Sequence, residues 1–150
     1  MEQRDLELEQ RVWQRVSGGP PVQQEATLAQ LERRCRESAG VFRQLAQSCA
    51  GVMRESLQEL YRQEYSNAMT ILGIRILSGE EPEKLSTCPW NKTGICRALA
   101  LAYRRSCQAR ADYEARAALG EYAPVFAQLA REEAEKMPRI LALIGLSKGG

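Results

Sequence analysis

Residues 122–144 read YAPVFAQLAREEAEKMPRILALI, and residues 53–78 read MRESLQELYRQEYSNAMTILGIRILS. In both stretches apolar residues recur every three or four positions, the spacing that places side chains on one face of an α-helix. Each apolar stripe is interrupted near its middle by a glutamate and by a second polar residue three positions later. The interrupting pairs are Glu64 with Asn67 and Glu133 with Lys136. Both pairs should point at neighbouring helices, where a charge must be paired or bound to a metal.

Two further amphipathic stretches complete an all-α pattern. Residues 25–49 and residues 94–119 carry apolar or small residues at the same spacing of three and four. Gly51, Gly120 and the turn residues before Pro82 separate the four stretches. The sequence therefore predicts an antiparallel four-helix bundle, which forms one domain over residues 25–150.

The first 24 residues form a separate unit. Residues 6–16 have the apolar pattern of a short amphipathic helix, with Trp13 on it, and residues 17–21 (SGGPP) follow as a linker. We expect residues 1–24 to be an N-terminal helical arm that docks on the bundle or on a partner.

Composition and charge exclude several classes of protein. The 21 basic and 19 acidic residues are well mixed, so the net charge of +2 offers no basic block for nucleic acid. No apolar run reaches the roughly 18 residues of a membrane span, and residues 1–10 do not resemble a secretory signal. The expected location is cytoplasmic, where the five cysteines would be reduced thiols. The absence of histidine removes the commonest transition-metal ligand and histidine-based acid–base catalysis.

The two halves of the bundle resemble one another weakly. In each half a cysteine on one helix precedes a glutamate on the next, and residues 60–64 (LYRQE) parallel residues 129–133 (LAREE). If the halves are related by a pseudo-twofold axis, six side chains should converge at the middle of the bundle. They are Cys35, Glu64, Asn67, Cys107, Glu133 and Lys136.

This layout resembles the ferritin-like superfamily, and in particular its small bacterial rubrerythrin-like proteins. The resemblance covers about residues 25–146, and residues 124–133 (PVFAQLAREE), which are similar to the family's final-helix signature, are its most specific part. The resemblance implies a di-iron site, with one carboxylate from each of the first and third helices. A Glu-x-x-His motif on each of the second and fourth helices completes such a site.

Carried over by position, two of the expected iron ligands remain in this chain, Glu64 and Glu133. The other positions hold Asn67 and Lys136 in place of the histidines, and Cys35 and Cys107, or its neighbour Ser106, in place of the carboxylates. An ordinary di-iron centre needs more oxygen and imidazole ligands. The chain therefore looks like a degenerate rubrerythrin-like protein that binds no cofactor and is not an enzyme. Such a protein would act as a homo-oligomer or with a protein partner, through its helical faces and its arm.

Two arrangements are open for the lysine of this degenerate site. A Lys136 ammonium between Glu64 and Glu133 would replace the charge of the metal, with Asn67 as a neutral bridge. In the other arrangement the lysine side chain extends to solvent.

The alternative function is metal binding or thiol-based redox chemistry. Cys35 and Cys107 would then form a reversible disulfide, or bind zinc or iron together with Glu64 and Glu133, as in a rubrerythrin-like oxidoreductase. Against this, cysteine is also a common small core residue. Cys88, in the connection after the second helix, is expected to be the most exposed thiol and the first to oxidise.

Overall fold

The structure is a computed structural model, and it describes residues 26–81, 94–118 and 120–149. These residues form four α-helices, which are α2 (Leu28–Gln47), α3 (Gly51–Leu77), α4 (Ile95–Ala117) and α5 (Ala123–Gly149). The described ranges contain no strand, so the predicted all-α class is confirmed. The helix α5 continues to Gly149, beyond the stretch 122–144 whose apolar spacing predicted a helix. The predicted arm (1–24) and Cys88 lie outside the described residues.

Local sequence sets where the helices begin. The Thr27 hydroxyl accepts a hydrogen bond from the Gln30 backbone N–H (3.1 Å), and the Gln30 side-chain oxygen accepts one from the Thr27 N–H (2.9 Å). This reciprocal cap satisfies two donors at the start of α2. The turns into α3 and α5 contain Gly51 and Gly120 with φ of 61° and 102°, a conformation that glycine adopts without a steric penalty.

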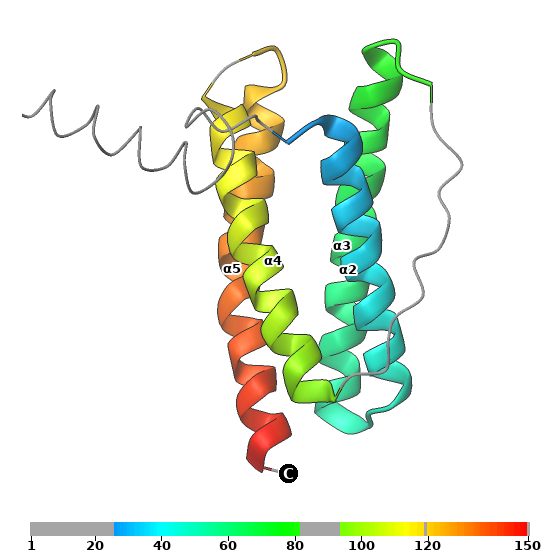
Figure 1. Cartoon of the computed structure of the whole chain (residues 1–150), viewed down its shortest axis with the longest axis vertical. Coiled ribbons are helices and arrows are strands. Elements are labelled where there is room, and N and C mark those ends of the chain that lie inside the picture. Colours follow the sequence, from blue (N-terminus) through cyan, green and yellow to red (C-terminus); the bar gives the residue numbers. More distant parts are fainter. Residues whose placement is uncertain (1–25, 82–93, 119, 150) are drawn as a thin grey trace, which may run out of the picture.

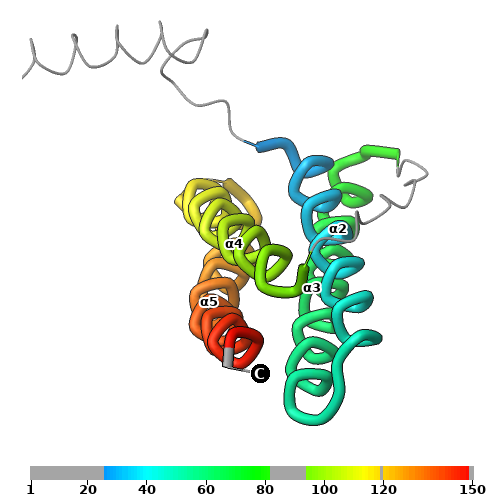
Figure 2. Tube along the Cα trace, turned by 60° about the horizontal axis from the view of Figure 1, so that its bottom comes forward, coloured from blue at the N-terminus to red at the C-terminus, as the bar shows by residue number. Residues whose placement is uncertain are grey.

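The helices form two hairpins, α2 with α3 and α4 with α5, which meet through α2 on α4 and through α3 on α5. Figure 1 shows the chain running down α2, up α3, up α4 and down α5, so that helices in contact run in opposite directions. Figure 2, seen closer to the bundle axis, shows the two hairpins lying side by side. No helix among the described residues is long and apolar enough to cross a membrane.

The apolar core is divided into two clusters along the bundle. One cluster lies towards the start of α2 and includes Leu31, Ile71, Tyr113, Phe126 and Leu129. The other lies towards the end of α2 and includes Phe42, Leu57, Leu60, Leu99, Ile140 and Leu143. The buried polar residues of the interrupted stripes lie between them, so the bundle has a polar layer at its middle.

A second buried ion pair, which the sequence did not predict, joins α2 to α3. Glu32 and Arg75 are 1% and 4% exposed, and Arg75 Nη1 donates to Glu32 Oε1 at 2.7 Å. The other oxygen of Glu32 accepts from Arg36 Nε at 2.8 Å. Because a buried charge without its partner is strongly unfavourable, this pair fixes the register of the hairpin.

Candidate functional site

The polar layer takes side chains from all four described helices. These are Cys35 from α2, Glu64 and Asn67 from α3, Ser106 from α4, and Glu133 and Lys136 from α5, each at most 5% exposed. The interrupted stripes predicted this burial for Glu64, Asn67, Glu133 and Lys136.

The Lys136 ammonium lies between the two glutamates. Its Nζ donates to Glu133 Oε1 at 2.9 Å and also to Glu64 Oε1. Burial by itself lowers the pKa of Lys136, but the charges and hydrogen bonds of Glu64 and Glu133 outweigh it, and the pKa lies above its ordinary value. Lys136 is therefore charged at neutral pH, and the structure has the ion-paired arrangement of the two considered.

Neutral groups lie against both glutamates as well. Ser106 Oγ donates to Glu133 Oε2, and Cys35 of α2 is close enough to Glu64 to lower its pKa. Cys35 Sγ lies 3.0 Å from the Tyr113 hydroxyl oxygen. Either the thiol or the hydroxyl can donate in this contact. This contact joins α2 to α4 next to Glu64 of α3.

Burial determines the protonation of this layer. Burial raises the pKa of Glu64 to about 7, with Glu133 adding to the shift and Lys136 opposing it. Burial and the charge of Glu64 hold the pKa of the Cys35 thiol well above its usual range. Burial does the same to the pKa of the Tyr113 hydroxyl, with Cys35 adding to it. Cys35 and Tyr113 therefore stay protonated at neutral pH, whereas Glu64 titrates there.

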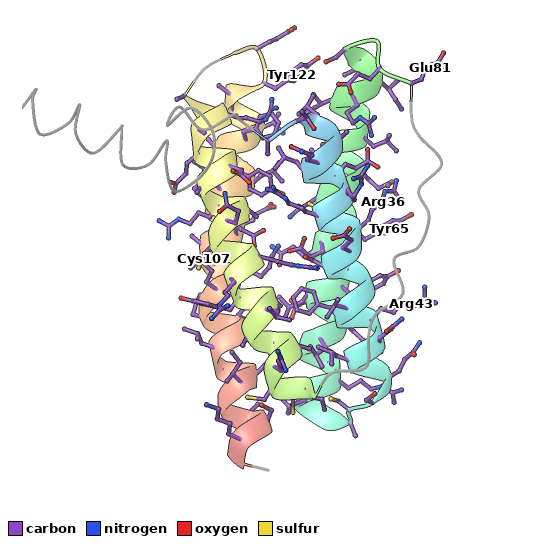
Figure 3. All side chains as sticks on the ribbon, in the orientation of Figure 1. Arg36, Arg43, Tyr65, Glu81, Cys107 and Tyr122 are labelled. Atoms are coloured by element: carbon purple, nitrogen blue, oxygen red, sulfur yellow. The ribbon has the colours of Figure 1, made fainter. Side chains whose placement is uncertain are left out.

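One predicted member of the centre is absent from it. Cys107 is exposed, and Figure 3 shows its label on the outer side of α4. Its neighbour Ser106, the competing assignment, is the buried residue. A step of one residue turns a helical side chain by about 100°, so a shift of one residue in the repeat moved the prediction to the wrong face. Cys35 and Cys107 are both free thiols, and the predicted set of Cys35, Cys107, Glu64 and Glu133 is not brought together.

Asn67 is buried as predicted but does not form the expected bridge. It is 3% exposed, and its Nδ2 has no hydrogen-bond partner. A buried amide donor without a partner costs on the order of 1–3 kcal/mol.

Replacing Asn67 with leucine, which has a similar shape, should therefore raise the free energy of unfolding by about 1 kcal/mol. Urea denaturation of the two proteins measures this difference. Serine at the same position, which keeps a polar group and leaves a void, should give no such gain. A destabilised Asn67→Leu variant would mean that the amide has a partner in solution.

A small cavity adjoins the ion pairs. It has a volume of about 20 Å³, and its lining includes Cys35, Glu64, Ser106, Glu133 and Tyr113. Arg34 and Arg105 line it as well. This volume suits about one water molecule.

The donors in the layer do not fit a di-iron centre. Glu64 and Glu133 already accept hydrogen bonds from Lys136, and the remaining groups are an ammonium, an amide, a hydroxyl and a protonated thiol. Hard divalent metals need several carboxylate or imidazole ligands. Within the described ranges, no group of three or more His, Cys, Asp or Glu side chains is placed to hold a metal ion.

Comparison with known proteins found no matching family model, no matching curated protein and no matching solved structure.

Proposed function

We propose that this chain is a ferritin-like protein whose metal centre has been replaced by an ion-pair network, and that it acts through assembly or by binding a protein partner rather than by catalysis. The observation that carries the proposal is the position of Lys136. Its ammonium lies where a cation is needed between Glu64 and Glu133, and it donates to both.

The arrangement of the helices supports the ferritin-like part of the proposal. Two antiparallel hairpins are joined by a connection that starts at one end of the bundle, after α3, and finishes at the other end, before α4 (Figure 1). Ferritin-like folds have one such long crossover, and their ligands project from the second and fourth helices. Glu64 and Glu133 occupy the corresponding helices here, α3 and α5.

The chemistry of the centre supports the non-catalytic part. A reactive cysteine needs a lowered thiol pKa, whereas burial and the charge of Glu64 raise the pKa of the Cys35 thiol. The adjoining cavity of about 20 Å³ holds about one water molecule, which leaves little room for a substrate. These groups are suited to holding four helices in register.

Metal content is the direct test of this proposal. We expect the untagged protein, purified from cells supplied with iron and zinc, to contain far less than one metal ion per chain by elemental analysis. All five thiols should react with a thiol reagent after unfolding. The Lys136→His variant, which restores an imidazole and removes the competing cation, should bind more iron than the wild type. Near-stoichiometric metal in the wild type that disappears in Glu133→Ala would overturn the proposal, and would assign the protein to the metal-dependent redox class.

A further inference from the structure

An apolar row runs along α3 beside its buried face, and one member, Met69, packs on the edge of the core. Its members, Tyr65, Met69, Leu72 and Ile76, follow a spacing of four, three and four residues. Tyr65 and Ile76 are 46% and 53% exposed, and Met69 and Leu72 are half-buried. We call these four residues the outer seam. A spacing of this kind is typical of a helix that packs against another helix, and the fully buried residues of α3 are a different set.

Arginines of α2 border the outer seam. The Arg43 guanidinium lies 5.9 Å from the centre of the Tyr61 ring, and the Tyr61 ring lies 6.2 Å from the ring of Tyr65. Figure 3 shows Arg36, Arg43 and Tyr65 along one side of the α2–α3 hairpin. The outer seam is therefore an apolar row with a basic border, which fits an apolar helix that carries acidic residues.

We propose that residues 6–16 of the N-terminal arm occupy the outer seam of their own chain. The arm offers an apolar set of matching length, made of Leu6, Leu8, Val12, Trp13 and Val16. On a helix, Glu9 shares a face with Leu6 and Trp13, and Asp5 lies one turn before Glu9. Both acids lie on the same face as the apolar set and would therefore face the bundle, where Arg43 at the border of the outer seam offers a positive charge, while Arg36 already donates to Glu32.

The connection is long enough for this docking. Ile76 follows Arg75, which pairs with Glu32 in the first turns of α2, so the outer seam begins close to where the arm joins α2. Nine residues, 17–25, separate residues 6–16 from Ala26 and reach up to roughly 30 Å when extended. From Tyr65 to Ile76 the outer seam covers eleven steps along α3, about 16 Å, and the eleven residues 6–16 would cover about the same length as a helix.

The size of the outer seam favours the arm over a second copy of the chain. A strip about 16 Å long and about 10 Å wide covers on the order of 160 Å². A stable interface between separate proteins buries about 800 Å² on each partner. A short tether raises the local concentration of the arm into the millimolar range, so a weak contact can persist within one chain.

The fluorescence of Trp13 tests the proposal in the full-length chain. Trp13 and Trp90 are its two tryptophans, so Trp90→Phe leaves Trp13 as the single reporter. We expect Trp13 to be shielded from acrylamide relative to the same chain unfolded in urea. The double variant Tyr65→Glu, Ile76→Glu, which adds charge at exposed positions, should abolish the shielding without loss of helix content. The control Leu101→Glu, Leu141→Glu changes residues of similar exposure, 47% and 49%, on α4 and α5 and should leave the shielding intact.

Reversing the charge on each side tests the contact between the acidic residues of the arm and the arginine at the border of the outer seam. Arg43→Glu should weaken the shielding of Trp13, and Glu9→Lys in the same chain should restore part of it. Shielding that disappears over a roughly hundredfold dilution would assign the outer seam to a second copy and overturn the proposal. The proposal would also be overturned if acrylamide quenched Trp13 as strongly as in the unfolded chain. It would be overturned as well if Trp13 stayed shielded in the Tyr65→Glu, Ile76→Glu double variant. These outcomes do not depend on metal content. The proposal that residues 6–16 dock on the outer seam and the proposal that the centre holds no metal can therefore be disproved independently.

Discussion

Replacing Lys136 with methionine should lower the free energy of unfolding by roughly 3–5 kcal/mol at pH 8, the largest effect expected of a single substitution in the polar layer. Lys136 is 1% exposed and donates to both Glu64 and Glu133. Methionine fills a similar volume, so the loss comes from two buried carboxylates that no longer have a cation. Chemical denaturation of the wild type and the variant measures it.

Two companion variants separate the loss of the ion pairs from other effects. Adding Glu133→Gln to Lys136→Met removes one of the two carboxylates and should recover a large part of the stability. Lys148→Met is the matched control, because Lys148 is exposed, and it should change the stability by less than about 0.5 kcal/mol. A harmless Lys136→Met at pH 8 would contradict the buried network and would favour a lysine that extends to solvent.

The sequence predicted much of this centre because a polar residue within the apolar stripe of a helix indicates a buried polar group. A glutamate at a core position of an amphipathic helix must be buried, so Glu64 and Glu133 were identified without a structure. Charge favoured the pairing of Lys136 with both glutamates, one of the two arrangements that the sequence left open. Cys107 was the error, since the weak repeat placed cysteine against cysteine. The spacing of Leu99, Ala102, Ser106 and Tyr113 along α4 favours Ser106, and this stripe was the better guide.

Other features of the centre depend on the three-dimensional arrangement. Glu32 and Arg75 interrupt no stripe, and their pairing depends on how α2 packs against α3. The hydrogen bond between Cys35 and Tyr113 joins helices that are distant in sequence, and no spacing in the chain indicates it. The unpaired amide of Asn67 depends on rotamers, which a residue pattern does not specify. Helix pattern and charge predict which polar groups are buried, whereas packing decides which of them meet.

The stability of the protein should depend on pH through Glu64. Its pKa rises from 4.5 to about 7 on folding. Between these values the folded state holds a proton that the unfolded state has lost. The free energy of unfolding therefore decreases as pH rises, by about 1.4 kcal/mol per pH unit from this group. Above the folded pKa the carboxylate is ionised in both states, and its contribution to the slope ends.

The comparison with Glu64→Gln isolates this contribution from the other acids of the chain. Over pH 4.5 to 7, the stability of the wild type minus that of Glu64→Gln should fall by up to roughly 3 kcal/mol. The charged or titratable groups near Glu64 are Cys35 on α2, Tyr113 on α4, and Glu133 and Lys136 on α5. Cys35 and Tyr113 are protonated and Lys136 is charged throughout this range, so none of these three produces the slope. Glu55→Gln, at an exposed position of α3, should retain the wild-type pH dependence. If the wild-type and Glu64→Gln curves run parallel, Glu64 is ionised in the folded protein at low pH, and the attraction of Lys136 exceeds the cost of burial.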